Sequence, residues 1–482
     1  MSVETPPSAR LAPTCLRVYL YLAWSAAMQL LLIGVTWGLW FPGLRAVQTT
    51  QDVKEGFREF PAIGLLDFAT LIPKWLDFSV AVLWTSALLV QMVASLRLLS
   101  LWQCSGPLRG PTLVRGANHD SLSGECSGPL RGPTMVRGAN HDNLAVRWTT
   151  TLEASLWVAV LAWMGLVVFN QHRLQAWGYL AVWIQGLYLL GSTSSGSRAR
   201  LKTGVLQSWR WLIISVYFYS AISKFDHTFL STLGSQFLTT GWNSLTGAHL
   251  ELGTVWPLWM TLMFPIGELI VAVGLASGQA RRWFVLLALL LHVGLLWLLG
   301  PWGMQHQAGV LLWNVFFIGQ VYLLFWPVRA PELTPNHEES LPARLALVLV
   351  LLIPLAQPAG WCDAWLAWEL YAPRGSRIQV FVAAPALEAL PELESYVEPE
   401  PTAEFGPLWR ELRIDQWSLD QLHAPIYPQD RFQLGVALAV ADRVPEPEQV
   451  FVRWLGTANR WTGQREQKIL RRYKATPMPP LV

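Results

Sequence analysis

The chain has 482 residues, of which 52% are hydrophobic and 14% are charged, and its formal net charge is +3. Soluble domains carry about 25% charged residues, so this composition indicates a membrane protein. The small net charge argues against a nucleic-acid partner. The four cysteines form no CxxC pair and have no zinc-finger spacing, which predicts no metal site and no disulfide framework.

Nine apolar stretches are long enough to cross a bilayer, which takes about 20 residues per helix. The first is too long for a signal-peptide core and lacks a small-residue cleavage site, so we expect it to be retained as a helix. The pattern predicts an all-α polytopic membrane bundle with spans at 16–40, 78–102, 150–169, 176–194, 206–223, 254–276, 283–300, 308–328 and 344–361.

Basic residues are unevenly distributed among the loops. Arg10 and Arg17 precede the first span, and the loops after the second, fourth, sixth and eighth spans are rich in basic residues. The loops after the third, fifth and seventh spans contain few, and the basic residues of loop 41–77 are balanced by acids. The positive-inside rule then predicts an N-terminus inside and a C-terminus outside. Lys224 would lie in the outer half of the membrane.

A tandem repeat occupies the loop after the second span. CSGPLRGPTLVRGANHDSL at 104–122 returns nearly unchanged as CSGPLRGPTMVRGANHDNL at 126–144, which is typical of a recent duplication. Its Cys, His and Asp residues could be read as metal ligands. Because Gly, Pro and Arg dominate and no apolar periodicity exists, we expect a disordered inside loop over 103–146.

The composition changes after the last span. Residues 362–482 contain acidic, proline-rich stretches around the strand-like runs RIQVFV, FQLGVALAV and QVFVRWL. The chain therefore divides into a transmembrane domain at 1–361 and a C-terminal extracytoplasmic domain at 362–482, of β or α+β type.

A lysine interrupts the apolar run WLIISVYFYSAISKFDHT at 211–228. On a helix, Tyr217, Ser220 and Lys224 form one polar stripe. The helix rises about 21 Å from Arg210 to Lys224, which is less than the hydrocarbon thickness of about 30 Å. An amine in a low dielectric loses its proton readily and can act as a base. Alternatively, Lys224 snorkels to the outer headgroups and pairs with Asp226.

Several other polar residues lie in apolar surroundings. Each one alone is typical of a contact between helices, but together they favour a shared polar cavity. His172 lies in the outside turn FNQHRLQAWGYL at 169–180, on the same side of the membrane as Lys224, where it could assist proton removal. The intramembrane candidates are Glu268, His292, His306, Asn314 and Gln320.

The Ser-Ala-x-x-Lys-Phe-Asp run that ends near Asp226, with the Asn-x-His turn at 170–172 upstream, resembles the vitamin K-dependent γ-carboxylase group and its bacterial relatives. These share the horizontally transferred transmembrane (HTTM) domain. The resemblance covers about 10–361, with a weak echo in WELYAPRGSRIQVFV at 368–382. It implies a multi-pass membrane protein. Because the first apolar span is expected to be retained, we expect the bacterial cytoplasmic (inner) membrane, with a eukaryotic endomembrane as the alternative.

The resemblance also implies a chemistry. By the motif, Lys224 would deprotonate vitamin K hydroquinone or another quinol and His172 would assist. Apart from the motif, the polar residues Tyr217, Ser220, His292 and His306 are candidates to contact the quinol. Oxygen would convert the quinol to an epoxide, and carbon dioxide would carboxylate an unknown acceptor, a lyase-type activity that needs no metal. Two departures stand out. Ser223 replaces the first of two family lysines, and the outside domain is much shorter than the carboxylase region that docks a substrate.

Two other functions remain open. A transporter could use Glu268, His292 and Asn314 along a path, but we find no internal repeat among the predicted spans. A non-catalytic membrane assembly or binding protein could use the abundant tryptophans and the outside domain, although tryptophans near helix ends are also typical of an aromatic belt.

Overall fold

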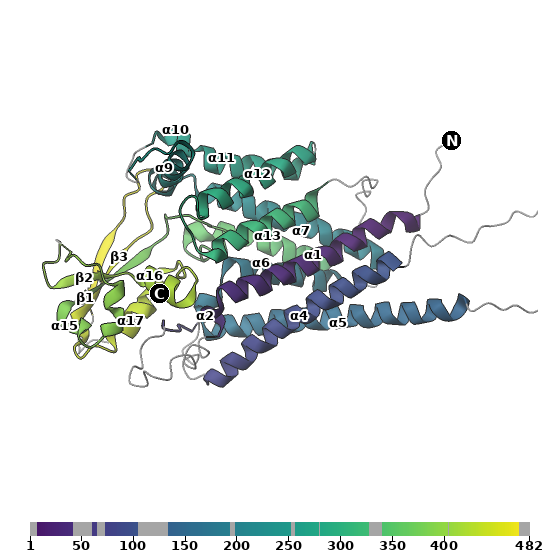
Figure 1. Cartoon of the computed structure of the whole chain (residues 1–482), viewed down its shortest axis with the longest axis horizontal. Coiled ribbons are helices and arrows are strands. Elements are labelled where there is room, and N and C mark those ends of the chain that lie inside the picture. Colours follow the sequence, from purple (N-terminus) through teal and green to yellow (C-terminus); the bar gives the residue numbers. More distant parts are fainter. Residues whose placement is uncertain are drawn as a thin grey trace, which may run out of the picture.

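In the computed structural model, the described residues are 7–41, 60–64, 73–104, 134–192, 198–251, 256–278, 280–326, 340–402 and 404–471. They form a long helical bundle with a small mixed domain at one end, and α1 begins at the opposite end (Figure 1). The bundle helices are α1 (Pro7–Val35), α4 (Lys74–Cys104), α5 (Thr134–Phe169), α6 (Ala176–Ser192), α7 (Arg198–Ser223), α11 (Met263–Ser277), α12 (Arg281–Leu299), α13 (Ala308–Phe325) and α14 (Leu341–Leu352).

Within the described ranges, seven helical segments are long and apolar enough to cross a membrane, which is consistent with an integral multi-pass membrane protein. These are Cys15–Val35, Lys74–Leu101, Asn143–Phe169, Leu258–Ser277, Arg281–Leu299, Ala308–Phe325 and Leu341–Ala359. Two further predicted spans, 176–194 and 206–223, are also helical in their described residues, in α6 and α7. These two helices contact each other, and both contact α1 and α14. The count of nine spans and the inside N-terminus stay predictions.

Buried glutamines connect helices inside the bundle. Gln185 Nε2 of α6 donates to Gln91 Oε1 of α4 at 3.1 Å and approaches Gln29 Oε1 of α1 at 3.5 Å. Gln91 in turn donates to the Leu22 carbonyl at 3.2 Å. Amide contacts of this kind satisfy polar groups that cannot reach water and help to specify which helices pack together.

Short elements surround the end of the bundle that carries the mixed domain. They are α2 (Trp37–Trp40), η3 (Gln171–Arg173), α8 (His227–Ser231), α9 (Leu233–Thr246), α10 (Leu258–Thr261) and η4 (Ile353–Ala359). Asp226 caps α8 by accepting a hydrogen bond from the Phe229 amide at 3.0 Å. Such a cap satisfies one of the free amides at the start of a helix, so the chain turns sharply after α7.

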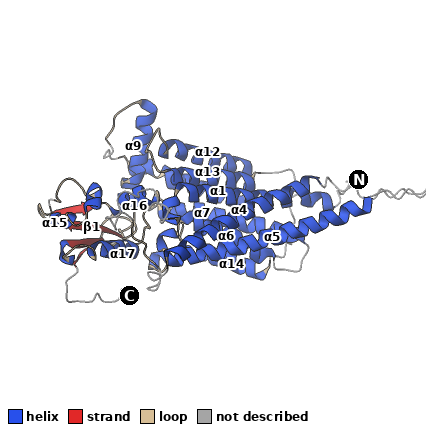
Figure 2. Ribbon diagram, turned by 60° about the horizontal axis from the view of Figure 1, so that its bottom comes forward, coloured by secondary structure: helices blue, strands red, loops and turns tan. Residues whose placement is uncertain are grey.

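The C-terminal domain is α+β. Its antiparallel sheet has the order β2-β1-β3-β4 and lies beside the helices of the domain (Figure 2). The strands are β1 (Arg377–Ala383), β2 (Trp409–Leu412), β3 (Val450–Leu455) and β4 (Gln467–Arg471). The helical segments are α15 (Ala384–Leu387), η5 (Pro391–Tyr396), α16 (Ile414–Leu422), α17 (Asp430–Ala441) and η6 (Pro447–Gln449).

Two of the three strand-like runs are strands: RIQVFV lies in β1, and QVFVRWL apart from its first residue forms β3. The third prediction is wrong, because FQLGVALAV forms most of α17. Phe432, Val436 and Val440 recur every four residues and are fully buried, and this spacing places them on one helix face. That face contacts β1 and β3.

The segment 103–146 also differs in part from its prediction. Helix α5 begins at Thr134, so the end of the expected disordered loop is helical. Residues 105–133 lie outside the described part of the chain, as do the side chains of His141 and Asp142.

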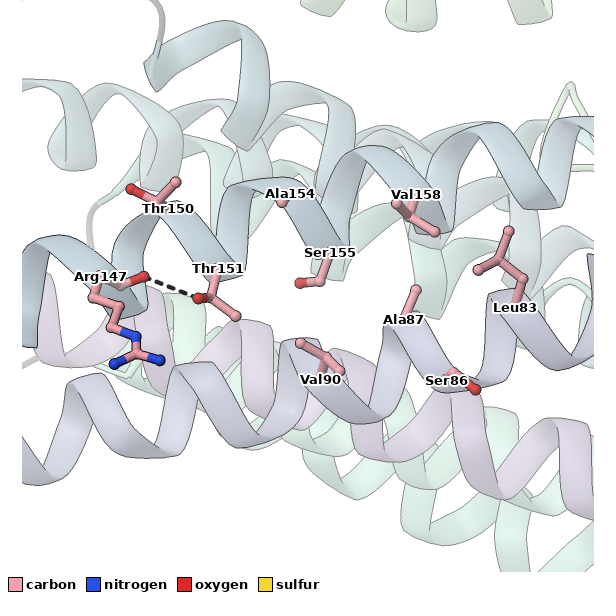
Figure 3. A pocket seen from close by; sticks show the side chains of 10 residues that line it. All are labelled: Leu83, Ser86, Ala87, Val90, Arg147, Thr150, Thr151, Ala154, Ser155 and Val158. Atoms are coloured by element: carbon pink, nitrogen blue, oxygen red, sulfur yellow. Dashed lines mark hydrogen bonds between the residues drawn. The ribbon is translucent and has the colours of Figure 1, made fainter.

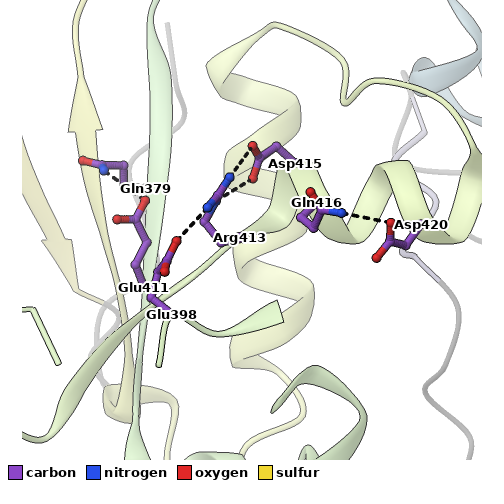
Figure 4. Close-up of polar contacts among 7 residues, drawn as sticks. All are labelled: Gln379, Glu398, Glu411, Arg413, Asp415, Gln416 and Asp420. Carbon is purple, nitrogen blue, oxygen red and sulfur yellow. Dashed lines mark hydrogen bonds and ion pairs between the residues drawn. The ribbon is translucent and has the colours of Figure 1, made fainter. Parts of the chain in front are cut away.

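An exposed ion-pair network lies where β2 leads into α16. Arg413 donates to Glu398 at 2.6 Å and to Asp415 at 3.3 Å, while Gln379 bonds Glu411 on the neighbouring strand (Figure 4). The side chains of the Arg413 ion pairs are 43–54% exposed. Exposed pairs contribute at most about 1 kcal/mol each, so we assign this surface a local structural role.

Candidate functional site

Lys224 follows directly after the last residue of α7, and its side chain turns back along that helix. Its ammonium donates to Ser220 Oγ at 2.6 Å and to the Ser220 carbonyl at 3.1 Å. Lys224 is only 4% exposed. The predicted polar stripe on α7 therefore exists, and its lysine lies inside the protein.

The charge partner of Lys224 is Glu268 of α11. The ammonium lies 2.9 and 2.8 Å from the two carboxylate oxygens, and the two side chains are 5% and 15% exposed. The snorkelling alternative paired Lys224 with Asp226, but Asp226 caps α8 instead. A buried charge is tolerated when it is paired and hydrogen-bonded, so α7 and α11 bring together two groups that would be costly to bury apart.

A second polar chain lies beside this pair. The Tyr217 hydroxyl is 2.5 Å from His292 Nε2, and His292 Nδ1 is 2.9 Å from Asn314 Oδ1. The amide nitrogen of Asn314 donates to the Val310 carbonyl at 3.0 Å, so its oxygen faces the histidine. His292 must then carry its proton on Nδ1 and accept from Tyr217 through Nε2. The lone pairs of the Tyr217 oxygen remain available to a ligand.

These groups line one cavity of about 60 Å³. That space holds a few water molecules and is smaller than the roughly 300–1,000 Å³ of typical small-molecule pockets. The expected shared cavity is confirmed for Glu268, His292 and Asn314. Gln320 does not line it, since its Oε1 accepts from Tyr21 at 2.9 Å. The polar lining residues are Tyr217, Ser220, Lys224, Glu268, His292, Asn314 and Tyr371.

Part of the cavity wall comes from the segment that links the bundle to β1. Leu370 and Tyr371 line the cavity, and Trp368 and Tyr371 have φ values of 59° and 57°. Residues other than glycine rarely adopt this left-handed backbone conformation, and strained backbone of this kind is common at functional sites. The Tyr371 hydroxyl is buried without a hydrogen-bond partner among the described residues.

His306 lies behind this wall. Its ring is 6.0 Å from the Tyr371 ring, centroid to centroid, in a T-shaped contact. His306 does not line the cavity, but it contacts two residues that do: its ring packs on Tyr371, and its amide donates to the Leu299 carbonyl at 2.8 Å. Burial lowers the pKa of His306 below its ordinary value.

His172 lies elsewhere, between the bundle and the C-terminal domain. It is fully buried, and its ring packs against Phe60 and Phe432 at centroid distances of 5.5 and 5.1 Å. Nε2 is 2.8 Å from the Pro425 carbonyl, so it donates. Desolvation lowers the pKa of His172 to about 4; the Pro425 bond opposes the shift and Arg173 adds to it. Of the predicted pair, only Lys224 lies at the cavity.

The turn that contains His172 is a structural junction. Arg173 is fully buried and forms an ion pair with Asp77 of α4. Arg431 of α17 contacts Asp363, donating to Oδ1 at 2.8 Å, and Tyr427 also bonds the Asp363 carboxylate. The Arg173–Asp77 pair fixes the turn to α4, and the Asp363 contacts lie within the C-terminal domain. The bond from His172 to the Pro425 carbonyl joins the two, so the polar residues of the turn have structural partners and need no chemical role.

Sequence reasoning did not predict that Glu268 pairs with Lys224 or that Leu370 and Tyr371 close the cavity. A carboxylate within the apolar run FPIGELIVAVGL was a signal for a buried partner, but nothing local indicated which cation it met. Within the described ranges, no cluster of three or more His, Cys, Asp or Glu residues could hold a metal ion. Comparisons with family models, curated proteins and solved structures found no match for this chain.

Proposed function

We propose that this protein is a membrane enzyme in which the Lys224–Glu268 pair accepts a proton from a hydroxyl group of a hydroquinone, which then reacts with oxygen. The observation that carries the proposal is the contact of the Lys224 ammonium with both oxygens of a buried carboxylate inside a cavity. The resemblance of the Ser-Ala-x-x-Lys-Phe-Asp run to the γ-carboxylase group supports the choice of a hydroquinone over other hydroxyl compounds.

The polar lining of the cavity favours a ligand that donates hydrogen bonds. The Glu268 carboxylate only accepts, and the Tyr217 oxygen presents its lone pairs because its proton points to His292. A hydroquinone brings two hydroxyl donors, whereas a quinone brings only acceptors. The apolar side chains around these groups, Phe237, Trp313 and Phe317 among them, suit an aromatic ring.

The pair can take up a proton without creating an isolated charge. An ammonium has no free lone pair, so either Glu268 accepts the ligand proton or Lys224 first passes its own proton to Glu268 and then accepts. In both orders the pair gains one proton and one positive charge remains beside the new phenolate oxygen. Such charge compensation stabilises the deprotonated ligand most strongly in a site that excludes water.

The remaining chemistry is that of the ligand and oxygen. Hydroquinone and one O₂ molecule yield the quinone epoxide and one water molecule, which balances atoms and electrons. Coupled carboxylation of an acceptor by carbon dioxide forms the second stage of the proposal. We assign no catalytic role to His172, because its ring is held by Pro425, Phe60 and Phe432 away from the cavity.

A ring can enter only if the cavity widens, since the present volume is about 60 Å³. We propose that the segment with Leu370 and Tyr371 moves to admit it. Two left-handed residues in this segment lower the cost of leaving its present conformation, because their backbone strain is released.

The test is epoxide formation from vitamin K hydroquinone and oxygen by the full-length protein in nanodiscs. Lys224→Met and Glu268→Gln should each reduce the rate about 100-fold or more, the usual range for loss of an acid–base group. Tyr217→Phe should reduce it less. The matched control is Tyr21→Phe, which also removes one hydroxyl bond from a buried tyrosine of the bundle and should leave the rate unchanged.

The proposal is wrong if the wild-type protein makes no epoxide from any of several quinols. It is also wrong if folded Lys224→Met retains the wild-type rate. Incorporation of labelled carbon dioxide into co-purifying peptides or small molecules tests the second stage separately.

A further inference from the structure

A long groove runs between α4 and α5, apart from the Lys224 cavity. Its volume is about 680 Å³, within the roughly 300–1,000 Å³ of small-molecule sites. Figure 3 shows mostly small side chains along both walls, which leave open space between the two helix surfaces. They are Ser86, Ala87 and Val90 on α4, and Ala154, Ser155 and Val158 on α5.

The groove opens onto an apolar surface. Leu83 at its rim is 52% exposed, and Leu161, one turn beyond Val158, is 61% exposed. Both helices are membrane-span candidates, so lipid chains would cover this surface. The three hydroxyls of the α5 wall are satisfied by their own helix: Thr150 donates to the Val146 carbonyl at 3.1 Å, Thr151 to the Arg147 carbonyl at 2.9 Å and Ser155 to the Leu152 carbonyl at 2.8 Å. The walls therefore suit a hydrocarbon chain.

A cation marks one end of the groove. Arg147 extends from α5 toward α4 there, and among the residues drawn in Figure 3 its guanidinium has no hydrogen-bond partner. Arg97 lies seven residues after Val90, so it continues the same stripe of α4 toward that end. This end of the bundle is the one at which α1 begins, opposite the mixed domain (Figure 1).

We infer that the groove binds an anionic phospholipid, with an acyl chain between α4 and α5 and the phosphate at Arg147. A guanidinium binds phosphate oxygens through paired hydrogen bonds, and basic pockets between membrane helices recognise anionic headgroups. The groove lies on helices that contribute no residue to the Lys224 cavity, so this site is independent of the proposed function.

The experiment is native mass spectrometry of the full-length protein released from detergent after addition of phosphatidylglycerol or phosphatidylcholine. Wild type should retain phosphatidylglycerol in preference to phosphatidylcholine. Arg147→Gln should weaken phosphatidylglycerol retention about fivefold, the contribution of one basic residue near an anionic lipid. Arg282→Gln is the matched control, an exposed arginine at the start of α12, and should bind as wild type does.

Ala87→Leu with Ala154→Leu fills the groove and should reduce retention of both lipids. Ala154→Leu alone, at an exposed position, serves if the double variant does not fold. The inference fails if the wild-type protein retains phosphatidylglycerol and phosphatidylcholine equally. It also fails if Arg147→Gln and Arg282→Gln reduce phosphatidylglycerol retention by the same factor. Unchanged lipid retention in the variant with the filled groove would also overturn the inference. So would a homodimer that Ala154→Leu dissociates without any loss of lipid, because the groove would then bind a second copy of the chain.

Discussion

The ammonium of Lys224 lies 2.8 and 2.9 Å from the two carboxylate oxygens of Glu268, and this contact joins the end of α7 to the first half of α11. Removing one partner of a buried pair leaves an uncompensated charge, whereas removing both does not. The pair is therefore both a structural connection between two helices and the proton-accepting group of the proposed site.

The first prediction concerns this coupling. Lys224→Met and Glu268→Gln should each destabilise the protein by roughly 3 kcal/mol, because each leaves one charge buried without its partner. The double variant should be closer to wild type than the sum of the two losses predicts. Thermal unfolding in detergent, followed by tryptophan fluorescence, measures all four proteins. Additive losses would show that the two side chains do not interact.

The second prediction concerns His172, whose pKa falls from 6.5 to about 4 through burial. Between these values the unfolded chain binds a proton that the folded chain does not. The contribution of His172 to the free energy of unfolding is thus fully present above pH 6.5. It decreases by on the order of 3 kcal/mol as the pH falls toward 4. His172→Gln should flatten the unfolding profile between pH 6.5 and 4. His249→Gln, at an exposed histidine, should retain the wild-type slope.

The third prediction has the opposite sign and concerns Glu369, next to the cavity wall. Desolvation raises its pKa to about 7, against the opposing effect of Arg374 and Arg460. The folded state therefore binds a proton at Glu369 more tightly than the unfolded state does. Protonation of Glu369 thus stabilises the fold, and this contribution is fully present below about pH 4.5 and is lost as the pH rises through 7.

Glu369→Gln mimics the protonated form and should raise the unfolding temperature at pH 8 relative to wild type. The difference should disappear below pH 4.5. Glu388→Gln, at an exposed carboxylate, should show no such dependence. A gain of equal size at pH 4 and pH 8 would mean that the glutamate does not titrate with folding.

The fourth prediction concerns the contact of α1 with α13. The Trp24 indole lies across Gly319 and donates to the Phe316 carbonyl at 3.3 Å, and a Cβ atom at position 319 would overlap the indole ring. Gly319→Ala should lower the unfolding temperature because the ring must move. Gly294→Ala, which meets no atom within 4 Å, should be neutral or slightly stabilising, since alanine is the better helix former. Equal effects would exclude the overlap as the cause.

The sequence by itself determined the membrane character and the positions of the long helices, because these depend on local composition and on the length of apolar runs. The division near residue 362 stays a prediction. It also placed Tyr217, Ser220 and Lys224 on one stripe, since helical periodicity is local. Strand prediction from the sequence was less successful. The run FQLGVALAV forms α17, and its apolar residues at four-residue intervals are buried because that helix packs on β1 and β3.

Only the tertiary structure decided which polar groups meet. Glu268 is separated from Lys224 by α8, α9 and α10 along the chain, and nothing in either local sequence specifies the other. His172 precedes Lys224 on the predicted outer side, yet it packs against the C-terminal domain. Such pairings depend on how the helices pack in three dimensions. A buried charge is tolerated only beside an opposite charge, and the local sequence does not show which distant residue supplies it.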